Sequence, residues 1–197
     1  MTDTKKVRGR PRKLDPDQAA AIAMELFWRK GYDAVGISDL IQALGVKSPS
    51  LYAAFGNKAN IFAAALNAYD GLVGPQFAPA FAEQTVQGFT GRMLEIAADV
   101  YTSNPDLPGC LVLDGARNSD DPDAKAHAAT HREALTSSMA QRLEVLGAEN
   151  PTQLADYITI AMLGLSGAAR SRLHTDSIRQ SAKALALALD RSEASNV

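Results

Sequence analysis

The chain has 197 residues, of which 46% are hydrophobic and 21% are charged, as expected of a folded globular protein. Its one cysteine excludes an internal disulfide framework, and its longest apolar run, residues 158–169, is too short for a bilayer, which needs about 20 residues. The net charge of −2 is unevenly distributed, because residues 1–58 carry +4 and residues 59–197 carry −6. We therefore expect a cytoplasmic protein without a membrane anchor. Its basic N-terminal part, residues 1–58, is expected to bind a polyanion.

The first 14 residues form a polar, basic arm without hydrophobic periodicity. The stretch VRGRPRKL holds Arg8, Arg10 and Arg12, separated by a glycine and a proline. We expect the arm to be disordered on its own. Its RGRPR core resembles an AT-hook, in which arginines lie along a narrow A·T minor groove. The alternative is a basic tail that contacts only phosphates.

The first helix is predicted directly after the arm. Asp15 is placed to act as N-cap, Pro16 suits the first helical position, and Gly31 ends the apolar periodicity. Phe27 would face the core, with Trp28 at the edge of the same face.

Two short helices are predicted next. The first would begin at Gly36 and end at Gly45, which takes a left-handed turn at little steric cost. The second would begin with Ser48 as N-cap and Pro49 as first helical residue, and would end at Gly56. Two short helices joined by a tight glycine turn form a helix-turn-helix signature.

The N-terminal end of the second short helix would present a polar face. A helix N-terminus carries free N–H groups and positive partial charge, which suit the negatively charged lining of the major groove. The residues expected to contact DNA there are Lys47, Ser48, Pro49, Ser50, Tyr52 and, at the start of the next helix, Lys58. The alternative is a small three-helix packing unit that merely has a polar face.

The rest of the chain is predicted to be helical as well. Asn57 would cap a longer helix, and the pattern becomes irregular beyond Gly74. Further helices are predicted at about residues 85–103, 109–118, 122–147, 151–173 and 176–191. Because no segment has the pattern of a strand, the fold class is all-α.

The segment ELFWRKGYDAVGISDLIQALGVKSPSLYAAFGNKANIF closely resembles the DNA-binding domain of the TetR family of bacterial transcriptional regulators. The strongest matches are Phe27, Gly31, Tyr32, Asp39, Leu40, Gly45, Val46, Leu51, Tyr52, Phe55 and Lys58. One branch of that family also tends to have a GRPR arm and a Gly-Cys-Leu stretch, here residues 109–111. The chain departs from the family at Gly36, where a Thr or Ser usually caps the helix and touches a phosphate. Ser38 is expected to replace that contact.

The resemblance implies three parts: a basic arm over residues 1–14, a helix-turn-helix DNA-binding domain over 15–70, and an effector-binding and dimerisation domain over 71–197. It implies a homodimer that binds a palindromic double-stranded DNA operator. The implied function is that of a ligand-released repressor with an unknown small-molecule effector.

The last two predicted helices carry apolar stripes that suit a dimer interface. The stripes are Leu154, Ile158, Met162, Leu165 and Ala169 on the first, and Ile178, Ala182, Leu185 and Leu189 on the second. Small residues such as Gly164, Gly167 and Ala168 would allow close approach of two helices. The alternative is that both stripes pack inside the monomer.

Five residues are candidates to line an effector pocket, and each has a structural alternative. They are Met93, Tyr101, Cys110, His127 and His131. Met93 and Tyr101 could equally be core residues. Cys110 would be either a low-pKa sensor thiolate or a buried, inert thiol. The two histidines have the i, i+4 spacing of metal ligands, but a solvated helix face is the expectation, so no metal or cofactor is assigned.

Two other functions compete with the regulator. The first is an architectural protein that binds AT-rich DNA without an effector, which would leave the large acidic C-terminal part unexplained. The second is an enzyme, but no Gly-rich phosphate loop, nucleophile elbow or convincing metal set appears in the sequence. A DNA-binding regulator is therefore the prediction.

Overall fold

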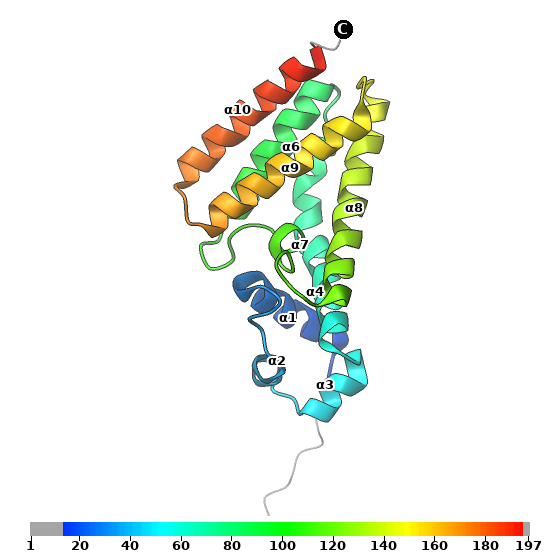
Figure 1. The fold of residues 1–197 in the computed structure, drawn as a ribbon, viewed down its shortest axis with the longest axis vertical. Helices are drawn as coiled ribbons and strands as arrows, with labels where there is room; N and C mark the ends of the chain where they lie inside the picture. Colours follow the sequence, from blue (N-terminus) through cyan, green and yellow to red (C-terminus); the bar gives the residue numbers. More distant parts are fainter. Residues whose placement is uncertain (1–13, 195–197) are drawn as a thin grey trace, which may run out of the picture.

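The computed structural model describes residues 14–194, and the regular secondary structure in that part is entirely helical (Figure 1). Its elements are α1 (Pro16–Lys30), α2 (Ile37–Leu44), α3 (Ser48–Phe55), α4 (Lys58–Val73), the 3-10 helix η1 (Gly74–Phe77), α5 (Ala78–Phe81), α6 (Val86–Thr102), α7 (Leu111–Asp114), α8 (Pro122–Val145), α9 (Pro151–Arg170) and α10 (Thr175–Ala194). Within these residues, no helix has the length and apolar character needed to cross a bilayer.

Local caps set several helix ends, as the sequence predicts. The Asp15 side chain accepts a hydrogen bond from the main-chain N–H of Asp17 at 3.1 Å, and Asn57 accepts one from that of Asn60 at 2.7 Å. Gly45 ends α2 with φ 63°, a left-handed conformation that costs glycine little. The predicted starts of α1 and α4 and the end of α2 are confirmed.

The predicted start of α3 is one residue too late. Lys47 occupies the N-cap position with extended backbone, Ser48 is already helical, and no side chain caps the helix. The first-turn N–H groups of a helix have no intrahelical partner, so proline fits the second helical position as well as the first. Pro49 therefore indicates the first turn of α3, but not the residue at which the helix begins.

The helix predicted over residues 109–118 shrinks to the single turn of α7. Gly109 has φ 74° and Cys110 is extended, so neither can continue a helix. Contacts with α9 hold this backbone: the N–H of Cys110 donates to Ser166 Oγ at 2.7 Å, and Arg170 Nη2 donates to the Cys110 carbonyl at 3.2 Å. These partners lie more than fifty residues away, beyond the reach of local sequence pattern.

The helices form two connected parts (Figure 1). The short α2 and α3 lie at the lower end of the molecule, and α6, α9 and α10 pack on one another at the upper end. The long α4 contacts both α1 and α8, and it runs across the predicted domain boundary at residue 70. In the lower part, the rings of Phe27, Tyr32 and Phe62 pack at centroid distances of 5.1–5.7 Å.

Apart from Leu185, the apolar stripes predicted to form a dimer interface face the monomer's own core instead. Leu154, Ile158, Met162, Leu165 and Ala169 are all buried, as are Ile178 and Ala182, while Leu189 packs against the core and Leu185 is 37% exposed. α9 contacts α6, α8 and α10, and those contacts occupy its most apolar face. Besides Leu185, the large apolar residues exposed on these helices lie outside the predicted stripes: Tyr157 and Ile160 on α9 and Leu187 on α10.

Candidate nucleic-acid interface

The outer face of α3 carries most of the predicted DNA contacts. Leu51 is fully buried and Phe55 partly so, and this anchoring turns the opposite face of α3 outward. Tyr52 is 45% exposed, so a large part of this side chain is open to solvent on that face. The predicted residues that are exposed here are Ser38 on α2 and Lys47, Pro49, Ser50 and Tyr52 at α3, and Ser48 is half-buried.

A carboxylate on α2 holds the start of that helix. The side chain of Asp39 accepts a hydrogen bond from the Gly36 N–H at 2.8 Å, and its other oxygen lies 3.5 Å from Lys30 Nζ. The hydrogen bond from Gly36 and the charge of Lys30 both lower the pKa of Asp39. Asp39 thus makes one half of a capping box, from its carboxylate to the Gly36 N–H, while the reciprocal contact is missing because Gly36 has no side chain. Through Lys30, Asp39 also ties α2 to α1.

Lys58 lies differently from the other predicted DNA contacts. Its Nζ lies 4.1 Å from the centroid of the Tyr32 ring, within cation–π range, and the side chain is half-buried. Burial lowers the pKa of Lys58, against the opposing influence of Asp33 and Asp121. In this structure the ammonium faces an aromatic ring of its own chain, whereas that of Lys47 stands in solvent. The arm arginines Arg8, Arg10 and Arg12 lie outside the described residues.

Met93, Tyr101 and Cys110 are buried in the C-terminal core. Burial raises the pKa of the Cys110 thiol, although hydrogen bonds to it act in the opposite direction. A sensor thiolate requires a lowered pKa and access to solvent, and Cys110 has neither in this structure. The inert, buried thiol is the alternative that agrees with the structure.

The two histidines on α8 do not form a ligand pair. His131 Nδ1 lies 2.5 Å from Asp70 Oδ2, which ties α8 to α4, and His127 is half-buried one turn away. Among residues 14–194, no three His, Cys, Asp or Glu side chains gather as a metal site requires. The predicted solvated face is thus only partly solvated, because His131 makes a contact between helices.

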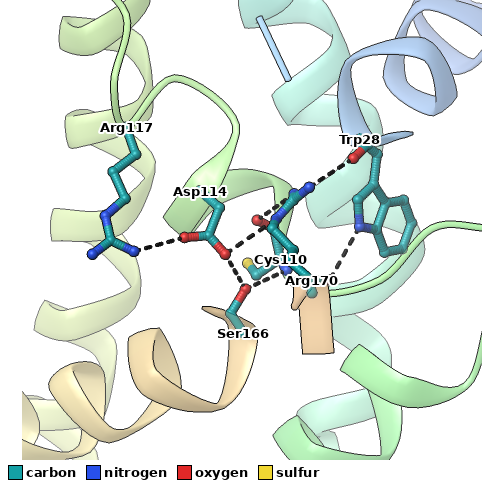
Figure 2. Close-up of polar contacts among 7 residues, drawn as sticks. Trp28, Cys110, Asp114, Arg117, Ser166 and Arg170 are labelled. Carbon is teal, nitrogen blue, oxygen red and sulfur yellow. Dashed lines mark hydrogen bonds and ion pairs between the residues drawn. The ribbon is translucent and has the colours of Figure 1, made fainter. Parts of the chain in front are cut away.

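Sequence reasoning missed a polar network around Arg170 (Figure 2). The indole N–H of Trp28 donates to the Gly109 carbonyl at 3.0 Å, and Arg170 Nη1 donates to the Trp28 carbonyl at 3.0 Å. Arg170 Nε also lies 3.2 Å from Asp114 Oδ2, which accepts a further hydrogen bond from Ser166 Oγ. This Arg170 network joins the last turn of α1 to α7 and α9. No sequence pattern predicts these contacts; the Gly-Cys-Leu stretch at residues 109–111 is only a feature of one branch of the family.

A second connection lies beside the first. The N–H of Tyr32 donates to the Gly115 carbonyl at 2.7 Å, and its hydroxyl donates to Asp121 Oδ2 at 2.5 Å. Ser119 Oγ donates to Asp33 Oδ1 at 2.7 Å. Burial first, and then the bond to Asp121, raise the pKa of Tyr32, while the same bond lowers the pKa of Asp121. The segment after α1 is therefore bound to the segment after α7.

Comparison with known proteins identifies this arrangement. Residues 21–65 match the family model of the bacterial regulatory proteins of the tetR family. The HTH-type transcriptional repressor BdcR of Escherichia coli K12 is 35% identical over 166 residues, which are 84% of each chain. The chain belongs to the TetR family. The HTH-type transcriptional repressor ComR of the same organism is 32% identical over 189 residues, 89% of each chain.

Solved structures agree with this assignment. A cysteine mutant of the TetR-family regulator CifR, complexed with 26-base-pair double-strand operator DNA, superposes with a TM-score of 0.81 and 26% identity, covering 91% of this chain and 99% of that one. A TetR-family regulator from Rhodococcus sp. RHA1 is 30% identical over 87% of this chain, with a TM-score of 0.57. The all-α fold with an N-terminal helix-turn-helix is confirmed, and the chain is a DNA-binding transcriptional regulator.

Proposed function

We propose that the protein is a cytoplasmic homodimeric repressor, which binds a palindromic double-stranded operator and releases it when a small molecule binds the C-terminal part. The observation that carries this proposal is the outward face of α3, held by the buried Leu51 on a fold that binds operator DNA in CifR. A buried anchor with an exposed polar face suits a recognition helix in the major groove.

Within this proposal, α3 reads base edges while other groups position the protein. Ser50 and Tyr52 face outward near the start of α3, where the helix dipole also favours phosphate. Lys47 supplies a solvent-exposed positive charge beside them. Ser38, which is exposed on α2, would contact the DNA phosphate backbone in place of the hydroxyl that the family usually has at position 36. The arm arginines Arg8, Arg10 and Arg12 would hold the neighbouring minor groove.

The exposed faces of α9 and α10 support dimerisation. Ile160 is 63% exposed and Tyr157 40% exposed on α9, and Leu187 is 53% exposed on α10. Gly164 on α9 and Ala184 on α10 are exposed too, and such small residues let helices of two subunits approach closely. A symmetric pair of subunits matches a palindromic site, because one domain of this size reads only a half-site.

Site selection from a random duplex library, followed by footprinting, tests the proposal. We expect a short palindromic site whose two halves lie on one face of the DNA, with sharply defined protection. Uniform protection across unrelated sequences, graded only by A·T content, would instead establish the architectural alternative. Sedimentation of the free protein and of the complex measures whether two subunits occupy each site.

A further inference from the structure

A groove between α7, α8 and α9 is lined in a way that the proposed DNA contacts do not explain. Its volume is about 370 Å³. Val112, Leu113 and Leu163, together with alanines, form an apolar floor. Three cationic side chains complete the lining: Arg117, Lys125 and Arg132. No acidic residue is among the described residues that line it, although Arg117 pairs with Asp114 just outside the lining, so the lining of this cationic groove is positively charged.

The size and lining of the cationic groove indicate which class of ligand it would bind. Small-molecule sites in proteins have volumes of roughly 300–1,000 Å³, so the groove suits a small ligand. The apolar floor favours a short hydrocarbon chain, and arginine binds a carboxylate through two parallel hydrogen bonds. The ligand that matches the charge and the apolar floor of the cationic groove is therefore an organic carboxylate with a short apolar chain.

One of the three cations is shared with the Arg170 network. Arg117, whose side chain is 58% exposed, has its Nη1 3.3 Å from Asp114 Oδ1. The other oxygen of Asp114 accepts from Ser166 and lies beside Arg170. Figure 2 shows the Asp114 carboxylate between the two guanidinium groups, with Arg170 reaching on to the Trp28 carbonyl. The groove is thus linked to the last turn of α1 by contiguous polar contacts.

We infer that the cationic groove is the effector site of the proposed repressor, that its ligand is an organic carboxylate with a short apolar chain, and that ligand binding is transmitted to α1 through Arg117, Asp114 and Arg170. This inference rests on the proposed function and names its ligand class. A carboxylate in the groove competes with Asp114 for Arg117. The Asp114 side chain is only 6% exposed, so it then depends more strongly on Arg170, the residue that holds the Trp28 carbonyl.

The binding part is tested by calorimetric titration of the full chain with hexanoate, using hexan-1-ol and hexylammonium as matched probes of neutral and opposite charge. We expect saturable binding of hexanoate and no saturable binding of hexan-1-ol or hexylammonium. Lys125→Gln and Arg132→Gln should each weaken it about tenfold, the effect of losing one charged hydrogen-bond partner. Arg92→Gln is the matched control, because Arg92 pairs with Glu95 on α6, outside the groove. No binding, or equal binding by all three variants, overturns the assignment of the site.

The transmission part has a built-in probe, because Trp28 is the only tryptophan of the chain and its indole donates to Gly109. Hexanoate should change the Trp28 emission of the wild type and weaken operator binding. In Arg117→Gln, hexanoate should still bind through Lys125 and Arg132, yet leave both signals unchanged. Since Arg117 is largely exposed, this variant is expected to fold, and circular dichroism checks that it does. A full response in Arg117→Gln overturns the transmission route.

The outcomes separate this inference from the proposed function. Operator release by some other molecule, with no hexanoate binding, refutes the inference and leaves the repressor intact. Hexanoate binding with the expected variant pattern, in a protein that selects no palindromic site, refutes the repressor and leaves the ligand site. Because coupling between two ligands is reciprocal, operator DNA must weaken hexanoate binding by the same factor by which hexanoate weakens operator binding.

Discussion

Arg170 of α9 donates a hydrogen bond to the main-chain carbonyl of Trp28 in α1, across 142 residues of sequence and a distance of 3.0 Å. The same guanidinium pairs with Asp114 and donates to the Cys110 carbonyl. One side chain thus joins the DNA-binding part, the short α7 segment and the C-terminal helices.

Replacing Arg170 should destabilise the whole molecule. Arg170→Ala leaves the buried Asp114 without one of its cations and removes the partner of the Trp28 carbonyl, so we expect a loss of roughly 3 kcal/mol in the free energy of unfolding. Urea unfolding measures it. Arg179→Ala is the control, because Arg179 pairs with Asp99 on the surface and should change stability by less than about 1 kcal/mol. Equal losses in the two variants would contradict the structural role of Arg170.

Substitutions on the outer face of α3 should separate DNA binding from stability. Tyr52→Ala should weaken operator binding roughly tenfold, and Lys47→Ala should lower the slope of log affinity against log salt by about 1 per subunit. Neither should alter urea unfolding appreciably. Leu51→Ala should instead cost about 2–5 kcal/mol of stability, because Leu51 is fully buried. Loss of binding only in Leu51→Ala would mean that α3 does not touch DNA.

Two glycines with positive φ should respond very differently to alanine. A Cβ at Gly45 would meet no atom within 4 Å, so Gly45→Ala should cost only the backbone strain of about 1 kcal/mol. A Cβ at Gly109 would lie 2.8 Å from Ser166 Oγ and 2.9 Å from Arg170 Cγ. Gly109→Ala should therefore lower the melting temperature much more and change the Trp28 emission. Similar melting temperatures would show that α9 can move away at no cost.

Cys110 should be unreactive in the folded protein. Its thiol is buried and its pKa is raised, so both access and thiolate fraction are low. We expect alkylation by iodoacetamide at neutral pH to be at least about tenfold slower in the native protein than in urea. The measurement is mass spectrometry over time. Fast modification of the native protein, accompanied by loss of operator binding, would restore the sensor hypothesis.

The hydrogen bond from Tyr32 to Asp121 should make stability depend on pH. A carboxyl with a lowered pKa stabilises the fold above its unfolded pKa, and this contribution disappears as pH falls through the folded value. Tyr32→Phe keeps the ring contacts but removes this bond, so it should cost about 1 kcal/mol at neutral pH after allowance for solvent screening. The difference from wild type should shrink below about pH 4. Unfolding measured from pH 7 down to about pH 2 checks this, and a difference that stays constant over that whole range would contradict it.

The sequence by itself determined where most helices begin and end. Asp15, Gly45 and Asn57 act on backbone groups two to four residues away, so their effect can be recognised without any knowledge of the fold. The outward face of α3 also followed from the sequence, because an apolar residue at the position of Leu51 orients the whole short helix.

Only the tertiary structure decided the rest. The apolar stripe of α9 could have faced a second subunit or its own monomer, and packing between α6, α8 and α10 assigned it to the monomer. Hydrogen bonds that join Cys110 to Ser166 and Arg170 hold a non-helical backbone where the sequence predicted a helix over residues 109–118. Lys58 packs over the Tyr32 ring and does not extend fully into solvent. Each of these outcomes depends on a partner far away in the chain, and periodicity describes only neighbours within a few turns of a helix.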